Sequence, residues 1–229
     1  IHIGGDECPK VRWEKCPKCQ ARIKALGIKG DSQYTAEQKL QSHFTQRVDE
    51  YLAAHGRTCI GWDEILEGGV SDNATVMSWR GEKGGIEASR LGHRVIMVPA
   101  KRYYFDYYQT VHRDSEPLCI GSYISPKQVY EYNPVPAELT TEEQQYIWGT
   151  QANLWTEYIP TFAKALYMYL PRAAALAENQ WSPQECKDWQ RFKDVRLPRL
   201  LKLYELYGYN YSRRMYEDSE EDADATMPW

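Results

Sequence analysis

Residues Ile1-His-Ile-Gly-Gly-Asp-Glu7 begin with a short apolar run and end in two adjacent carboxylic acids. Apolar residues that alternate and then stop at a pair of glycines are typical of a strand ending in a turn. Thr58-Cys-Ile-Gly-Trp62 has the same form and is followed by Asp63-Glu64. The two stretches predict strands whose carboxyl ends carry polar side chains.

Strand-like and helical runs alternate along the rest of the chain. The predicted strands are 1–5, 58–62, 75–79, 94–98 and 147–154, and the predicted helices are 14–26, 32–54, 82–91, 161–177 and 183–207. This alternation favours an α/β fold with a parallel sheet. Five strands at this spacing predict about the last five β/α units of a (β/α)8 TIM-type barrel, followed by C-terminal helices.

Three parts are expected within the 229 residues, with no linker between separate domains. Residues 1–180 should form the C-terminal portion of the barrel, 181–215 a helical extension, and 216–229 an acidic, solvated tail. The Tyr-rich segment from Ala100 to Glu138 has little periodicity, and a long loop in a compact domain is usually functional.

The helix predicted over 32–54 should bury one apolar stripe. Its members are expected to be Leu40, Phe44, Val48, Tyr51 and Leu52. Residues three or four apart share a helix face, so these positions would form one apolar stripe.

Composition excludes several functional classes. The 28 basic and 32 acidic residues give a net charge of −4, which offers no electrostatic attraction for nucleic acid. No apolar run approaches the roughly 20 residues that span a bilayer. The chain opens at Ile1 without Met, which we interpret as a cut upstream that could have removed a targeting segment.

The six cysteines leave two interpretations open. Cys16-Pro-Lys-Cys19, with Cys8 nearby, has the thiolate spacing of a zinc site. A structural zinc site needs four ligands, and neither a second such pair nor a matching pair of histidines follows. Reduced thiols or one disulfide are therefore favoured, and neither a metal nor another cofactor is expected.

Acidic and aromatic side chains gather just after the predicted strands, where barrel enzymes place their chemistry. They are Asp6, Glu7, Trp62, Trp79, Tyr104, Asp106, Trp155 and Glu157. Indole and phenol rings stack on sugar faces and offer a polar group at the rim. Packing in the core is the alternative for each tryptophan, although a core indole is more often found in mid-strand or on a helix stripe.

Five segments in one order resemble the β-N-acetylhexosaminidases of glycoside hydrolase family 20. They are His2–Glu7, Gly61–Ile65, Ser78–Gly81, Tyr104–Asp106 and Asn153–Glu157, within a resemblance that covers residues 1 to about 180. The resemblance implies an exo-acting, retaining hydrolase of glycans that end in β-linked N-acetylhexosamine. It also implies a secreted or periplasmic location.

Adjacent acids fit this resemblance better than a conventional pair of catalytic carboxylates. Most retaining glycosidases place two carboxyl groups on opposite sides of the scissile bond, about 5–5.5 Å apart. Asp6 and Glu7 are neighbours, so they are expected to point in divergent directions. The family instead uses the sugar's own acetamido oxygen as nucleophile through an oxazolinium. Glu7 is then the general acid and base, and Asp6 orients and stabilises the acetamido group; a helix-capping acid pair is the alternative.

The resemblance also assigns sugar contacts. Trp62, Trp79 and Trp155 would enclose the acetamido methyl group, and Tyr104 would donate a hydrogen bond to the acetamido oxygen. Asp106 and Glu157 would accept hydrogen bonds from sugar hydroxyls. Asp63 and Glu64 are expected to hold loops rather than substrate.

Several hypotheses about the function remain as alternatives. The chain could be an N-acetylhexosamine-binding fragment without turnover, an assembly fragment, or a hydrolase with a protein nucleophile. An arginine and a histidine of the family's site would lie upstream of Ile1, so we expect the isolated chain to be weakly active or inactive and prone to associate. The oligomeric state and the preference for gluco or galacto sugars are left open.

Overall fold

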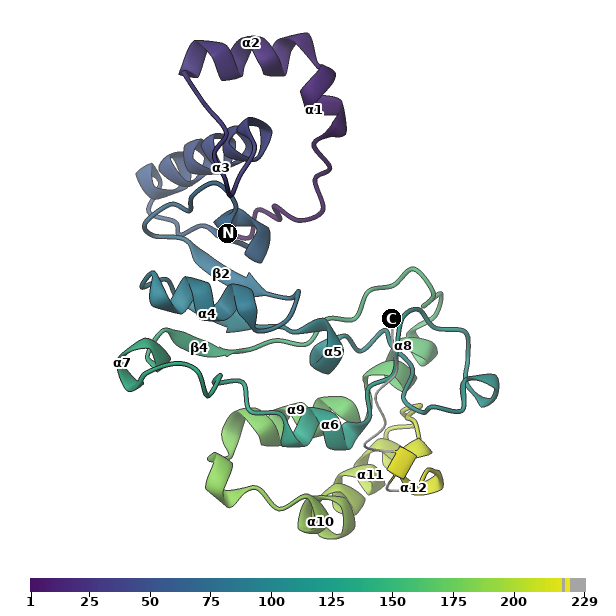
Figure 1. The fold of residues 1–229 in the computed structure, drawn as a ribbon. Helices are drawn as coiled ribbons and strands as arrows, with labels where there is room; N and C mark the ends of the chain where they lie inside the picture. The colour runs from purple at the N-terminus through teal and green to yellow at the C-terminus, as the bar shows by residue number, and fades with distance from the viewer. Residues whose placement is uncertain (220, 223–229) are drawn as a thin grey trace. The chain divides into compact units, whose positions relative to one another are not determined.

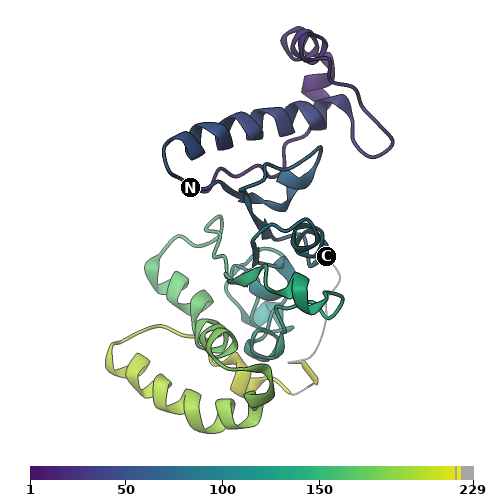
Figure 2. The same cartoon turned by 90° about the vertical axis from the view of Figure 1, so that its left-hand side faces the viewer.

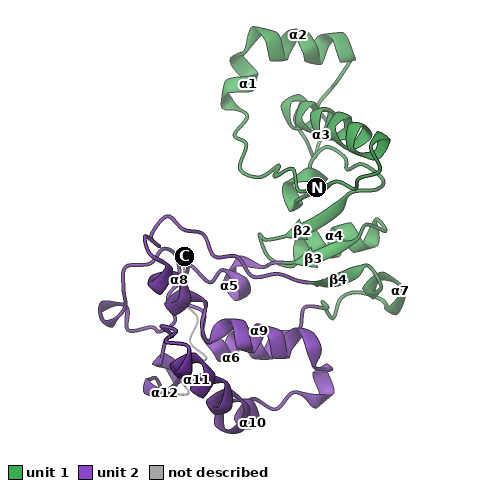
Figure 3. Ribbon diagram, turned by 180° about the vertical axis from the view of Figure 1, so that it is seen from behind, with its two compact units in different colours: residues 1–97, 135–149 green, residues 98–134, 150–229 purple. Residues whose placement is uncertain are grey.

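The computed structural model describes residues 1–219 and 221–222, which form two compact units. Unit 1 comprises residues 1–97 and 135–149, and unit 2 comprises 98–134 and 150–229 (Figure 3). This grouping does not test the predicted boundaries at 180 and 215, which stay predictions. Most of the predicted acidic tail, residues 220 and 223–229, lies outside the described residues.

A four-stranded sheet lies at the centre of unit 1. Its strands are β1 Ile60–Trp62, β2 Thr75–Ser78, β3 Val95–Met97 and β4 Ile147–Thr150. The last residue of β4, Thr150, is grouped with unit 2. The strands follow one another in the sheet in the same order as in the chain. β1 and β2 run parallel with Ile60 opposite Thr75, and β2 and β3 run parallel with Val76 opposite Val95. The predicted parallel α/β class is therefore confirmed.

The first predicted strand lies beside β1 as a single parallel bridge between His2 and Ile60. Its backbone bonds nevertheless extend past the bridge, from the Ile3 N–H to the Ile60 carbonyl at 2.8 Å and from the Trp62 N–H to the Gly4 carbonyl at 3.0 Å. These bonds bring the segment carrying Asp6 and Glu7 to the end of β1 at Trp62.

The helices of unit 1 are α1 Val11–Lys15, α2 Pro17–Leu26, α3 Ala36–Ala54, α4 Lys83–Arg90 and α7 Thr141–Gln144, with a 3-10 turn, η1, over Asp63–Leu66. The single helix predicted over 14–26 is two helices. Cys16 ends α1 and precedes Pro17, which is the first residue of α2 and has no N–H to continue a helix. Figures 1 and 2 show α1 and α2 beyond α3, away from the sheet.

The predicted stripe of α3 is only partly correct. Leu40 and Leu52 are buried, whereas Phe44 and Tyr51 are 66% and 65% exposed. The buried face instead includes Thr45 and Asp49. Residues 45, 49 and 52 follow the spacing of one helix face, and Phe44 and Tyr51 are each one residue away from it. Leu52 joins strand residues and α4 in the core of unit 1.

Unit 2 is mainly helical. Its α-helices are α5 Ala100–Tyr103, α6 Pro126–Glu131, α8 Phe162–Tyr169, α9 Arg172–Trp181, α10 Trp189–Arg191, α11 Leu197–Leu206 and α12 Arg214–Glu217; 3-10 turns η2 and η3 cover Arg113–Ser115 and Gln184–Cys186, and a π-helical turn, η4, covers Phe192–Arg196. The helix predicted over 161–177 is broken at Pro171, and the one predicted over 183–207 begins only at Trp189. The segment 100–138, predicted as loop, contains α5, η2 and α6.

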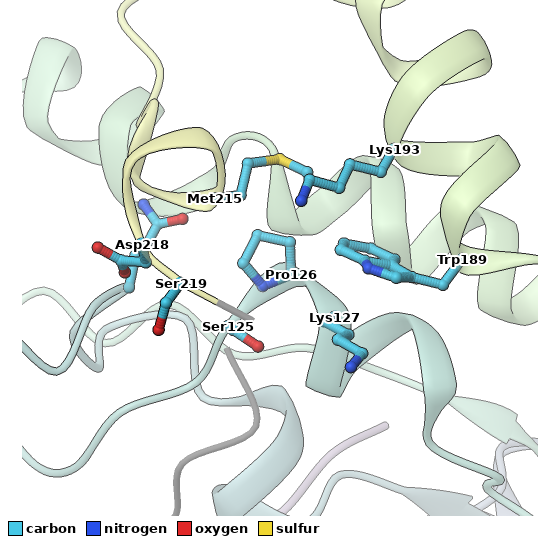
Figure 4. A pocket seen from close by; sticks show the side chains of 9 residues that line it. Ser125, Pro126, Lys127, Trp189, Lys193, Met215, Asp218 and Ser219 are labelled. Atoms are coloured by element: carbon cyan, nitrogen blue, oxygen red, sulfur yellow. The ribbon is translucent and has the colours of Figure 1, made fainter. Parts of the chain in front are cut away.

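A small pocket of unit 2 lies among α6, α10 and the chain after α12. Figure 4 shows Pro126 facing the indole of Trp189, with Met215 and Lys193 beside them. None of the eight predicted site residues lines this pocket.

Candidate active site

The segment Gly4–Glu7 leaves the sheet through an unusual backbone. Gly4 and Gly5 have positive φ of 73° and 103°, and Glu7 has a positive φ of 44° although it carries a side chain. A positive φ at a residue other than glycine costs free energy and is found preferentially at functional sites. Asp6 and Glu7 are both exposed at this turn.

Close packing requires the glycine at this turn. A Cβ atom on Gly5 would lie 2.7 Å from a side-chain carbon of Ile65. The Gly5 carbonyl accepts a hydrogen bond of 2.8 Å from Gln41 of α3. His2 accepts a hydrogen bond from the Gly4 N–H at its Nδ1, at 3.0 Å, and its ring lies edge-on to Trp62 at 4.9 Å between centroids. Burial lowers the pKa of His2, whereas the negative charge of Asp6 acts in the opposite direction. The lowered pKa favours the neutral ring, and a neutral ring can accept the hydrogen bond from Gly4.

Two indoles of unit 1 occupy the ends of β1 and β2. Trp62 is 8% exposed at the end of β1. Trp79 follows β2, and its Nε1–H donates to Glu64 at 2.9 Å. Glu64 thus fixes the orientation of the Trp79 indole, and its expected role of holding a loop rather than substrate stays a prediction.

Arg80 connects the same two strand ends. Its Nε donates to the buried Asp63 at 2.8 Å, and its Nη1 donates to Glu67 at 2.9 Å. Burial raises the pKa of Asp63 to about 7, opposed by the positive charge of Arg80 and supported by the neighbouring Glu64. The close approach of α4 explains the burial, because a Cβ on Gly84 would lie 2.6 Å from an oxygen of Asp63.

The other four predicted site residues lie in unit 2. Tyr104 forms a parallel bridge with Asn153, which brings the segments 104–106 and 153–157 side by side. The rings of Tyr104 and Trp155 meet edge to face at 6.2 Å. Trp155 is 41% exposed, and Glu157 is also exposed.

Asp106 is a buried carboxylate with one unused oxygen. It is 4% exposed, and among the described residues its Oδ1 has no hydrogen-bond partner. Burial raises the pKa of Asp106 to about 6, although its own N–H, that of Trp155 and the charge of Arg172 act in the opposite direction. An unpaired buried oxygen is costly, so this one is suited to accept a hydroxyl donor.

Arg172 supports this part of unit 2 and was not predicted from the sequence. It is fully buried and donates to the backbone carbonyls of Phe105, Ile124 and Met168. Its guanidinium carbon lies 4.9 Å from the centroid of the Phe105 ring. Because Phe105 precedes Asp106, Arg172 acts as a positioning residue. The only local signal was one charged residue at the head of the apolar run Ala173–Ala177.

Within residues 1–219 and 221–222, no group of three His, Cys, Asp or Glu side chains is arranged to hold a metal ion. The same residues include no helix long and apolar enough to cross a membrane. The zinc interpretation of Cys8, Cys16 and Cys19 therefore has no support from their placement.

Comparisons with a family model and with known proteins agree on one family. A family model described as glycosyl hydrolase family 20, catalytic domain, matches residues 1–184. A β-hexosaminidase of Porphyromonas gingivalis is 46% identical over 215 residues, covering 92% of this chain and 26% of that protein. A β-hexosaminidase of Vibrio furnissii is 32% identical over 181 residues, covering 77% of this chain and 28% of that protein.

Solved structures give the same result for the fold. An exo-β-N-acetylglucosaminidase of Vibrio harveyi in complex with N-acetylglucosamine matches with a TM-score of 0.79 and 33% identity, covering 93% of this chain and 33% of that one. A β-N-acetylhexosaminidase of Bacteroides fragilis matches with a TM-score of 0.74 and 27% identity, covering 98% and 44%. The chain thus spans between about a quarter and less than half of the length of these relatives.

Proposed function

The chain belongs to glycosyl hydrolase family 20, as its five quoted segments predicted, and we propose that it serves in releasing terminal β-linked N-acetylhexosamine from glycans. The (β/α)8 TIM-type class predicted for it is that of its structural relatives. The observation that carries the proposal is the exposed Asp6-Glu7 pair on a strained turn beside the carboxyl end of β1.

Glu7 is proposed as general acid and base. It donates a proton to the leaving oxygen while the acetamido oxygen of the sugar attacks the anomeric carbon, so the glycosidic bond breaks and an oxazolinium forms. Glu7 then takes a proton from the water that opens this ring, which restores the acid and retains the configuration. Asp6 accepts the acetamido N–H and offsets the positive charge that develops there.

The aromatic residues are proposed to hold the acetamido group. Trp62, Trp79 and Trp155 pack against its methyl group, and the Tyr104 hydroxyl donates to its oxygen. The Glu64 bond to Trp79 supports this role, since an indole held in one orientation costs less entropy on binding. The unpaired oxygen of Asp106 supports its assignment, with Glu157, to sugar hydroxyls.

The test is hydrolysis of an aryl N-acetyl-β-glucosaminide by wild type, Glu7→Gln and the matched control Glu14→Gln, an exposed glutamate of α1. Glu7→Gln should lose about 10²- to 10⁴-fold in kcat, because a glutamine cannot donate the proton. Its affinity for a thiazoline mimic of the oxazolinium should be retained, and Glu14→Gln should match wild type.

Other outcomes would contradict the proposal. Unchanged turnover in Glu7→Gln would exclude Glu7 as the general acid. Thiazoline affinity that neither Asp6→Asn nor Glu7→Gln changes, without turnover by the wild type, would favour a sugar-binding protein. A covalent sugar adduct on a carboxylate would indicate a protein nucleophile. The proposed secreted or periplasmic location is tested separately by cell fractionation.

A further inference from the structure

Cys16 and Cys19 occupy the N-cap and N3 positions of α2. Three other helices of this protein carry a capping box at the same two positions: Thr35 and Gln38 in α3, Ser125 and Gln128 in α6, and Thr140 and Glu143 in α7. In a capping box the N-cap and N3 side chains turn toward the first turn of the helix from opposite ends. In α2 the same two positions place two thiols in the first turn, three residues apart, with no side-chain hydrogen bond capping the helix.

The first turn of α2 also favours a thiolate on the first of these residues. No side-chain hydrogen bond caps this end of the helix. The N–H and thiol of Cys19 and the N–H of Lys18 lower the pKa of Cys16, whereas the bond to Cys16 raises the pKa of Cys19. Both cysteines are free and partly exposed, and α2 spans ten residues, so its dipole adds to the effect.

We propose that Cys16 and Cys19 form a thiol–disulfide exchange site, in which Cys16 is the nucleophile, Cys19 is the resolving thiol, and the substrate is an external disulfide. The assignment rests on residues of unit 1 that the glycosidase chemistry does not use. It is therefore independent of the proposed function.

The reaction balances in two steps. The Cys16 thiolate attacks one sulfur of the external disulfide, forms a mixed disulfide and releases one thiolate, which takes a proton from solvent. Cys19 then loses its proton to solvent and attacks the Cys16 sulfur, so the Cys16–Cys19 bond forms and a second thiolate leaves. Two cysteine thiols are oxidised, and one external disulfide is reduced to two thiols.

The exchange would act on a lightly packed part of the chain. α1 has no buried residue, and α2 buries only Ile23. Gln20 of α2 holds the two helices to their neighbours through bonds to the Trp13 carbonyl at 3.0 Å and to Glu37 at 2.9 Å. A disulfide between N-cap and N3 would fix the first turn of α2, so hydrogen exchange of the amides in 18–23 should slow on oxidation.

The experiment treats the reduced protein with oxidised glutathione and maps the products by mass spectrometry. Wild type should lose two hydrogen atoms from the peptide containing Cys16 and Cys19, without retaining glutathione. Cys19→Ser should instead trap glutathione on Cys16, and Cys16→Ser should trap none on Cys19 over the same time. Cys16→Ser keeps a favourable N-cap, so folding is preserved.

Cys186, an exposed cysteine of η3, supplies the internal comparison. In Cys19→Ser, Cys16 should react about tenfold faster than Cys186 near neutral pH, because Cys16 lies at the N-terminus of a ten-residue helix, where the helix dipole favours a thiolate. Cys186→Ser should form the Cys16–Cys19 bond as wild type does. Equal rates at Cys16 and Cys186, a lasting mixed disulfide in wild type, or pairing of Cys16 with Cys8 would overturn the proposal.

Discussion

At the scale of single residues, Asp106 shows how a binding group can cost stability. Its pKa is raised from 3.8 to about 6, chiefly by burial. A raised carboxyl pKa means that the folded chain holds the proton more tightly than the unfolded chain. The resulting stabilisation is present at low pH and is lost as the pH rises through about 6. The same ionisation prepares Asp106 to accept a sugar hydroxyl.

Asp106→Asn should remove this pH dependence. Wild type is expected to lose about 1 kcal/mol of unfolding free energy from this group between pH 5 and pH 8, and the variant should not. Denaturant titrations at both pH values measure the difference. Asp114→Asn, an exposed aspartate in η2, is the control. An equal pH dependence in Asp106→Asn and wild type would show that the carboxyl does not titrate in this range.

At the scale of elements, Arg80 joins the carboxyl ends of β1 and β2 through Asp63 and Glu67. Burial raises the pKa of Asp63 to about 7, so the contribution of this ion pair to the stability of the fold depends on pH. Below that pH Asp63 is mostly protonated and needs no cation. Above it, an ionised and buried carboxylate depends on Arg80.

Arg80→Met should therefore destabilise the protein in a pH-dependent way. We expect a loss of about 2 kcal/mol of unfolding free energy at pH 8, because a buried charge loses its partner, and a much smaller loss at pH 5. Arg12→Met in α1 should have little effect at either pH. A loss for Arg80→Met that is the same at pH 5 and pH 8 would assign the effect to packing alone.

At the scale of the whole molecule, ligand binding is expected to raise the free energy of unfolding. A thiazoline mimic at one hundred times its Kd should stabilise the folded protein by about 2.7 kcal/mol and raise the thermal midpoint accordingly. Glu7→Gln should keep this shift, whereas Asp6→Asn should lose most of it, because Asp6 holds the acetamido nitrogen in the proposed scheme. Glucose has no acetamido group and should give no shift. An equal shift with glucose would refute acetamido recognition.

The fold class and the candidate site residues could be predicted because both depend on local sequence. Period-two apolar runs define strands, and glycine with acidic or aromatic residues after them marks their carboxyl ends. The turn at Gly4–Glu7 follows the same logic, since a glycine pair permits positive φ where other residues resist it.

Tertiary packing decided the rest, because it depends on which atoms meet from distant parts of the chain. Spacing alone could not choose the buried face of α3, which excludes Phe44 and Tyr51. It could not assign Glu64 to the Trp79 indole or Arg172 to the carbonyl beside Asp106. The sequence by itself determined the family and the strand ends. The folded structure alone determined their supporting contacts, since a hydrogen bond needs a partner within about 3 Å.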